Sequence, residues 1–287
     1  MLLAALVWGG ESMFAWYYRE DSSAVQFKNA IALSIDIFNN VYVLDAGSNE
    51  IVKLTPNLKL LRRIGGYGWK SGELDQPKDI ASPNGLDVFV ADYGNHRVLR
   101  FDKDLNLQTS TSSSDEVEGA NKLFGYPRSI ALSRFGSLFI IDSENKRIVK
   151  FSNDQTLERT FGNIHGGKGS LASPERIRIS GNDRVYIQDQ GQIVIFDIFG
   201  NYVKTLSKNL FQNLRTFAVD DKNLYVLDGC TIVIFDEGGN LKSKSALRVD
   251  GTGISCSSIV DFQVRNGIAY LLTRQMFTVH PIADSLK

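Results

Sequence analysis

Short runs of alternating apolar and polar residues recur along the chain, and most of them end in an aspartate followed by a turn. The clearest copies are VYVLDAGSNEIVKL at 41–54, VFVADYGNHRVLRF at 88–101 and LFIIDSENKRIVKF at 138–151. Three weaker copies follow at 185–196, 224–235 and 269–280. Apolar alternation with a period of two is typical of half-buried β-strands, and a short turn between two such runs indicates a hairpin. The pattern therefore predicts six related hairpins and no sustained helix.

The residues that open these turns come at nearly constant spacing. They are separated by 47, 50, 47, 39 and 45 positions and are Asp45, Asp92, Asp142, Asp189, Asp228 and Thr273. Each hairpin also has one apolar run before it and one after it, so each unit contains four short strands. A four-stranded unit repeated about every 45 residues is typical of a propeller blade. The sequence thus predicts an all-β fold, a six-bladed β-propeller of four-stranded antiparallel blades, in one domain over residues 24–287.

The two ends of the chain are expected to complete the ring. Only PIADSLK follows the last hairpin, which leaves the sixth blade without a fourth strand. The stretch FAWYYRE at 14–20 precedes the first complete blade and is predicted to supply that strand. Residues 1–23 are therefore interpreted as an apolar leader followed by a closing strand, and their removal is expected to expose a sheet edge.

The leader itself, MLLAALVWGG, has two interpretations. An apolar run followed by small residues resembles the hydrophobic part of a secretory signal, although no basic segment precedes it. A buried first strand would have the same composition. The signal interpretation favours a periplasmic or secreted protein over a cytoplasmic one, with membrane contact only through this leader or through a partner.

Two segments of the second unit resemble a known repeat family. They are GYGWKSGELDQPKDIA at 66–81 and DYGNHRVLRFD at 92–102. They are similar to the NHL repeat, whose pattern is a proline-led inner strand, a second strand like YVAD, and a DxGNHRI turn that leads into the third strand. The second and third units match this pattern well, the first matches it loosely, and the last three match mainly in their apolar alternation. The resemblance implies an NHL-type six-bladed propeller and is far more specific for the fold than for the function.

The turn residues are predicted to be structural because the aspartate recurs in five of the six units. Its carboxylate is expected to accept hydrogen bonds from the backbone amides of its own turn. Arg97 and Arg147 also recur, and we expect them to pair with the aspartates or with a neighbouring blade. His96 occurs in one copy only and is interpreted as a turn residue. The structural set is Asp45, Asp92, Arg97, Asp142, Arg147, Asp189 and Asp228.

Function is expected where the blades differ, in the long connections between them. These connections share one face of a propeller with the turns between second and third strands. They carry aromatic and imidazole side chains suited to a protein-binding patch, namely Tyr67, Trp69, Phe124, Tyr126 and His165. The alternative is that Trp69 and Phe124 only cover the tops of the blades.

A second candidate set lies where each inner strand begins, around the mouth of the central channel. The first position of this column is Asn29, Lys78, Arg128, Glu175, Arg215 and Val260, and the second is Ala30, Asp79, Ser129, Arg176, Thr216 and Asp261. Three cations and one anion in the first position predict a locally positive mouth that favours an anionic ligand or an acidic partner segment. The alternative is that sequence neighbours, such as Lys78 and Asp79, neutralise each other.

Composition limits the chemistry that this mouth can perform. The 287 residues contain 32 basic and 32 acidic side chains, so no whole-chain field favours nucleic acid, and a nucleic-acid partner is not expected. The three histidines, His96, His165 and His280, fall in different repeats. No nucleophile elbow, metalloprotease or phosphate-loop motif is present. No cofactor is predicted, although Asp79 and Asp261 are candidates for holding a divalent cation in the channel.

The two cysteines are predicted to lie on the same face of adjacent blades. Cys230 is in the second-to-third strand turn of the fifth unit, and Cys256 is in the connection into the sixth. They are candidates for a disulfide if their Cα atoms approach to within roughly 7 Å, and two partly buried thiols are the alternative.

These observations favour a non-catalytic binding platform that holds a protein or peptide partner on its loop-rich face, either alone or as a subunit of a larger assembly. The candidate binding residues are Tyr67, Trp69, Lys78, Asp79, Tyr126, Arg128, His165, Arg176 and Arg215. The alternative is a propeller enzyme of the lyase or hydrolase type that binds a small ligand and a divalent cation at the channel mouth.

Overall fold

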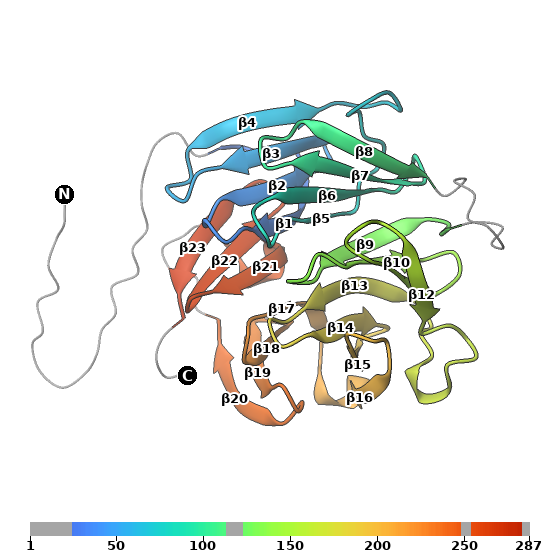
Figure 1. Cartoon of the computed structure of the whole chain (residues 1–287). Helices are drawn as coiled ribbons and strands as arrows, with labels where there is room; N and C mark the ends of the chain where they lie inside the picture. The colour runs from blue at the N-terminus through green and yellow to red at the C-terminus, as the bar shows by residue number, and fades with distance from the viewer. Residues whose placement is uncertain (1–24, 113–122, 248–253, 283–287) are drawn as a thin grey trace, which may run out of the picture.

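A computed structural model describes residues 25–112, 123–247 and 254–282 of the chain. Within them, six antiparallel sheets stand around a common centre (Figure 1). Blades 1 and 2 comprise β1 (Ala30–Ile35), β2 (Val41–Asp45), β3 (Glu50–Leu54), β4 (Leu60–Gly65), β5 (Asp79–Ala81), β6 (Asp87–Asp92), β7 (Arg97–Asp102) and β8 (Leu107–Ser112). Blade 3 comprises β9 (Pro127–Leu132), β10 (Leu138–Asp142), β11 (Arg147–Phe151) and β12 (Leu157–Phe161).

The second half of the ring repeats this order. Blades 4 and 5 comprise β13 (Pro174–Ile179), β14 (Arg184–Asp189), β15 (Gln192–Asp197), β16 (Tyr202–Leu206), β17 (Leu214–Val219), β18 (Asn223–Asp228), β19 (Thr231–Asp236) and β20 (Leu241–Ala246). Blade 6 comprises β21 (Ile259–Arg265), β22 (Ile268–Thr273) and β23 (Phe277–Pro281). In the described part of the chain, three single-turn 3₁₀ helices lie in connections between blades, at Gly167–Gly169, Lys208–Leu210 and Cys256–Ser258. The predicted six-bladed propeller is confirmed.

The ring closes where blade 1 meets blade 6, shown in blue and red side by side in Figure 1. The amide of Ala30 donates to the carbonyl of Arg274 at 2.8 Å. Leu33 of β1 and Leu272 of β22 belong to one buried apolar cluster. Among the described residues, blade 6 has three strands, as expected from the short C-terminal remainder. The segment at 14–20 lies outside the described residues, so its role as a fourth strand stays a prediction.

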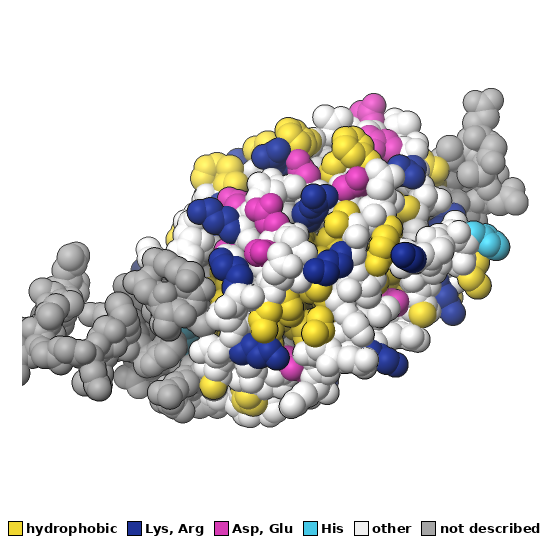
Figure 2. Space-filling model, turned by 90° about the horizontal axis from the view of Figure 1, so that it is seen from below, with side chains coloured by type: hydrophobic (Ala, Val, Ile, Leu, Met, Phe, Trp, Pro, Cys, Tyr) yellow, Lys and Arg dark blue, Asp and Glu magenta, His cyan; other side chains and the backbone are white. Residues whose placement is uncertain are grey.

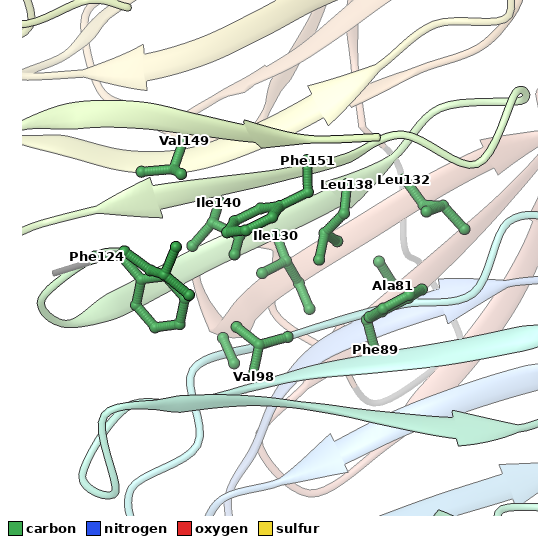
Figure 3. Close-up of a cluster of buried hydrophobic side chains, with 12 residues drawn as sticks. Ala81, Phe89, Val98, Phe124, Ile130, Leu132, Leu138, Ile140, Val149 and Phe151 are labelled. Atoms are coloured by element: carbon green, nitrogen blue, oxygen red, sulfur yellow. The ribbon is translucent and has the colours of Figure 1, made fainter. Parts of the chain in front are cut away.

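Apolar side chains between neighbouring blades form the core. Figure 3 shows one such cluster, in which Phe89 and Val98 of blade 2 face Ile130 and Ile140 of blade 3. Each strand presents alternate residues to each side, so every blade contributes to two of these clusters. Phe124, expected on the surface, is fully buried in this cluster. The prediction that Phe124 contributes to a protein-binding patch was wrong, because the connection folds inward over the gap between the blades.

Antiparallel order gives the ring two different faces. The turns between first and second strands and between third and fourth strands lie on one face, which we call the turn face. The turns between second and third strands and the connections between blades lie on the other, which we call the loop face. On the turn face, four turns share one device, in which an aspartate accepts from the side-chain amide of the asparagine four positions later, at Asp36, Asp102, Asp197 and Asp236. The turn face therefore repeats one polar device, whereas the connections on the loop face differ in length and sequence from blade to blade. In the space-filling view of Figure 2, acidic, basic and hydrophobic side chains are interspersed over the surface.

Candidate binding site on the loop face

The recurring aspartates anchor the loop face to the blades. Asp45, Asp92, Asp142 and Asp189 are buried. These four and the fifth turn aspartate, Asp228, each accept hydrogen bonds from backbone amides 15 to 17 residues upstream, in the connection that enters the aspartate's own blade. The donors are Lys28 and Asn29, Asp75, Gly125, Ala172 and Ser173, and Gln212 and Asn213. The turn aspartates thus hold the connections that carry the candidate binding residues.

This arrangement corrects part of the sequence interpretation. Backbone amides of the aspartate's own turn are described as donors only at Asp45, from Gly47 at 3.1 Å, and at Asp142, from Asn145 at 3.3 Å. The connections provide the shared donors because their irregular backbone leaves amides without a strand partner, and a buried unpaired amide is costly.

Arg97 extends this anchoring to the connection between blades 1 and 2. Its Nε donates to the buried carboxylate of Asp92 at 2.7 Å. Its terminal nitrogens donate to the carbonyls of Trp69 at 2.9 Å and Glu73 at 2.8 Å. Arg147 forms the matching ion pair with Asp142 at 2.9 Å. Both recurrent arginines therefore pair with the turn aspartate of their own blade.

The buried environment of Asp92 shifts the pKa of its carboxyl group. Burial raises the pKa of the Asp92 carboxyl, and the hydrogen bonds from Asn95, from the Asp75 amide and from Arg97 act in the opposite direction. Burial is the larger effect, so the net direction is upward. An ionised carboxylate in this position therefore depends on its ring of donors.

The connection held by Arg97 presents two exposed aromatic side chains. Tyr67 is 72% exposed and Trp69 is 73% exposed. The backbone beneath them is fixed, since Leu74 donates to Gly66 at 2.8 Å and Gly68 donates to Leu74 at 3.1 Å. These aromatic groups project from an ordered loop.

A cavity of about 720 Å³ opens beside this connection, at the mouth of the channel. It spans the inner ends of blades 1 to 4 and is lined by Asn29, Ile31, Ala46, Asn49, Tyr67, Asp75, Gln76, Pro77, Lys78, Arg128, Glu175 and Arg176. Of the predicted binding residues, the structure brings Tyr67, Lys78, Arg128 and Arg176 together here.

The other predicted residues have separate environments. Trp69 and His165 are exposed on their connections and do not line the cavity. Tyr126 is half-buried and packs against the His96 ring, with the ring centroids 4.0 Å apart. Arg215 donates to the carbonyls of Cys256 at 3.0 Å and Ile259 at 2.9 Å, so it holds the entry into blade 6. Its guanidinium is thus engaged in contacts within the fold, and its role as a binding cation stays a prediction.

Below the mouth, a buried ionic network crosses the ring. Arg178 of β13 donates to Asp79 of β5 at 3.0 Å and to Asp261 of β21 at 3.1 Å. Arg176 forms a second ion pair with Asp261. Burial alone would lower the pKa of Arg178, but the two carboxylates raise it above its ordinary value, so this guanidinium remains charged. The network ties blade 4 to blades 2 and 6.

These contacts remove Asp79 and Asp261 from the list of candidate ligands. Asp79 also accepts from the Ile130 amide at 3.2 Å, and Asp261 accepts from the Leu33 amide at 3.0 Å. Within the part of the chain that the structure describes, no group of three or more His, Cys, Asp or Glu side chains could hold a metal ion. The expectation that neighbours such as Lys78 and Asp79 neutralise each other was also wrong, because the partners of the aspartates come from across the ring.

Arg178 was missed by the sequence reasoning, although a signal was present. Arg176 and Arg178 are two positions apart in PERIRI, the inner strand of blade 4. Two arginines on the same side of an innermost strand face the centre of the ring, where a charge requires a partner.

A disulfide joins blades 5 and 6 on the loop face. Cys230 follows β18 and Cys256 precedes β21, and their Cα atoms are 5.4 Å apart. The bond closes a segment of 26 positions in sequence. It fixes the connection that Arg215 also holds.

Comparisons with known proteins agree with this architecture. Residues 74–101 match the NHL repeat family. The chain is a six-bladed β-propeller that contains an NHL repeat. Protein brain tumor of Drosophila melanogaster is 24% identical over 185 residues, which is 63% of this chain and 13% of that protein. The aligned part of this chain thus spans about an eighth of the length of that relative.

The similarity of this chain to solved structures concerns the fold alone, because the sequence identities are low. A streptogramin B lyase superposes with a TM-score of 0.59 at 10% identity, covering 90% of this chain and 85% of that one. A chain of a nidogen and laminin complex superposes with a TM-score of 0.57 at 16% identity, covering 76% of this chain and 81% of that one. The same propeller therefore occurs in an enzyme and in a protein complex.

Proposed function

We propose that this NHL-repeat propeller is a non-catalytic platform that binds a protein or peptide partner on its loop face. The observation that carries the proposal is the pair of exposed aromatic residues, Tyr67 and Trp69, on a loop fixed by Arg97. Exposed aromatic side chains on an ordered backbone provide large contact area at low entropic cost, which is typical of binding hot spots. The nidogen and laminin complex supports the proposal by analogy of fold.

A substitution on each face tests this assignment. Trp69→Ala removes an exposed aromatic from the loop face, and Phe135→Ala removes one that is 64% exposed from the turn face. Partners are first captured from the native cells on the full chain and identified by mass spectrometry. The Trp69 variant is expected to weaken binding of the captured partner by about 30-fold, in line with a hot spot of about 2 kcal/mol, and the Phe135 variant to leave it unchanged. Equal binding by both variants contradicts the proposal.

Arg97→Lys tests the contribution of loop order. Lysine keeps the positive charge beside Asp92 but lacks the planar fork that reaches the carbonyls of Trp69 and Glu73. The expected result is weaker partner binding with the two aromatic side chains intact. Unchanged affinity would indicate that loop order does not matter.

A second candidate function is supported by the size of the cavity. Its volume of about 720 Å³ lies in the range of small-molecule sites, about 300–1,000 Å³. This supports a small-ligand protein or a lyase-type enzyme, as in the streptogramin B lyase of the same fold. Native mass spectrometry of the protein isolated gently from its own cells separates the two candidates, because a retained small molecule favours the ligand site and a stoichiometric protein complex favours the platform.

We also propose that the protein works outside the cytoplasm. The disulfide between Cys230 and Cys256 supports this, since such bonds persist in oxidising compartments. Among the described residues, no helix is long and apolar enough to cross a membrane. Sequencing the mature N-terminus and fractionating the cells test the location. An unprocessed N-terminus in the cytoplasmic fraction contradicts it.

A further inference from the structure

Two of the three cations that line the cavity have no ion-pair partner among the described residues. Lys78 and Arg128 line the cavity, and no described carboxylate forms an ion pair with either. Arg97, Arg147 and Arg176 are each paired with an aspartate. Lys78 and Arg128 are therefore available to a ligand.

An aromatic cluster adjoins these cations. The Lys78 ammonium lies 5.1 Å from the centroid of the Tyr93 ring. The Tyr93 and Tyr126 ring centroids are 4.9 Å apart, and the His96 ring packs against Tyr126. The rings restrict water around the ammonium, and an ion pair is stronger where water is excluded. The cluster thus favours a ligand with both a negative group and an apolar part.

Two carboxylates in the same cavity limit which negatively charged ligands can bind there. Asp75 and Glu175 line the mouth together with the cations. Glu175 is held in place by the Gln188 side-chain amide at 3.0 Å. A nucleic acid or another polyanion would bring charge close to these carboxylates and be repelled, whereas a single carboxylate can reach the cations alone.

We propose that the mouth of the cavity recognises an acidic segment of a protein partner, with an aspartate or glutamate side chain of that segment bound by Lys78 and Arg128. This inference rests on the proposed platform function and names the chemistry of its partner. The neighbouring apolar side chains of the segment lie against Tyr67, at the wall of the same cavity. Nucleic acid is the competing ligand class, which the experiment distinguishes.

The test uses three fluorescent probes of similar length and the full chain. One is a blocked peptide with a single glutamate among leucine and serine residues, the second has lysine in place of that glutamate, and the third is a single-stranded RNA. Titrations are made at about 0.01 M ionic strength, where the Debye length is about 30 Å, and repeated at about 0.15 M. Lys78→Gln and Arg128→Gln are compared with Lys168→Gln, which removes an exposed cation from another connection of the loop face.

The expected result is saturable binding of the glutamate peptide, weakened about 10-fold by Lys78→Gln and by Arg128→Gln and unchanged by Lys168→Gln. Glu175→Gln is expected to strengthen binding of the peptide, because it removes a repelling carboxylate from the cavity. Absence of binding, equal loss with Lys168→Gln, or tighter binding of the RNA each overturns the inference. If a captured partner depends on Trp69 but not on Lys78 or Arg128, the inference fails and the platform function stands; if it depends on none of them, both fail.

Discussion

Replacing Arg178 tests whether the buried network holds the ring together. The Arg178 side chain on blade 4 is 8% exposed. It pairs with Asp79 of blade 2 and with Asp261 of blade 6. Methionine at this position keeps much of the volume and removes the charge, which leaves both carboxylates buried without this partner. Breaking a buried ion pair by removing one member costs about 3–5 kcal/mol.

The ion pairs that remain after the substitution indicate that the loss of stability lies near the lower end of this range. Asp261 keeps its ion pair with Arg176, whereas Arg178 is the one arginine described in contact with Asp79. The penalty should therefore fall mainly on Asp79, and we expect a loss nearer to 3 kcal/mol. For a chain of this size each kcal/mol lowers Tm by about 2–4 °C, so Arg178→Met should lower Tm by about 6–12 °C.

Differential scanning calorimetry of three variants checks this value. Arg134→Met is the matched control, because Arg134 pairs with Asp183 at 3.1 Å but its side chain is 58% exposed, and such a pair contributes at most about 1 kcal/mol. Adding Asp79→Asn to Arg178→Met removes the uncompensated carboxylate and should recover more than half of the loss. Equal destabilisation by the two arginine substitutions, or no recovery in the double variant, would refute the reasoning.

Three further predictions concern the disulfide, the turn face and the N-terminus. Reducing the bond between Cys230 and Cys256 should cost about 3–4 kcal/mol, since it closes a loop of 26 positions; Tm is measured with and without reductant, and the double serine variant should not respond to reductant. Hydrogen bonds from the asparagine four positions later lower the pKa of Asp102 and of Asp236. Their folded pKa lies below the unfolded one, so their stabilising contribution is present above about pH 4 and lost as the pH falls through the folded value. Tm should therefore fall in this window, and replacing both aspartates by alanine should flatten that fall; an unchanged profile would contradict the assignment. Deleting residues 1–23 should lower Tm by exposing the edge of blade 6, and an unchanged Tm would show that they supply no strand.

The repeated parts of the fold were predictable from the sequence. The alternation around Asp45, Asp92 and Asp142 encodes paired strands directly, because side-chain direction in a strand depends only on position along it. The spacing of these aspartates then fixes the number of blades, since each repeat must bury its two apolar faces against neighbours.

The contacts across the ring were not predictable in the same way. Whether Asp79 meets a metal ion, Lys78 or Arg178 depends on how six inner strands converge, and no local pattern contains that information. The burial of Phe124 has the same origin, because a connection between blades has no periodicity to show which side chains turn inward. For the candidate site, the sequence therefore indicated the face and the cavity residues Lys78 and Arg128, but not which charges were already neutralised.

The way in which the aspartates hold the connections has a consequence for engineering new recognition. Asp45, Asp92, Asp142 and their equivalents bind the connections through backbone amides. Every residue except proline has the same main-chain N–H donor. The exposed side chains of a connection can therefore be exchanged, or another loop grafted between the same anchor points with buried residues such as Phe124 retained, without loss of the contacts that fix its ends. The propeller thus offers a frame in which binding specificity can be rewritten at little cost in stability.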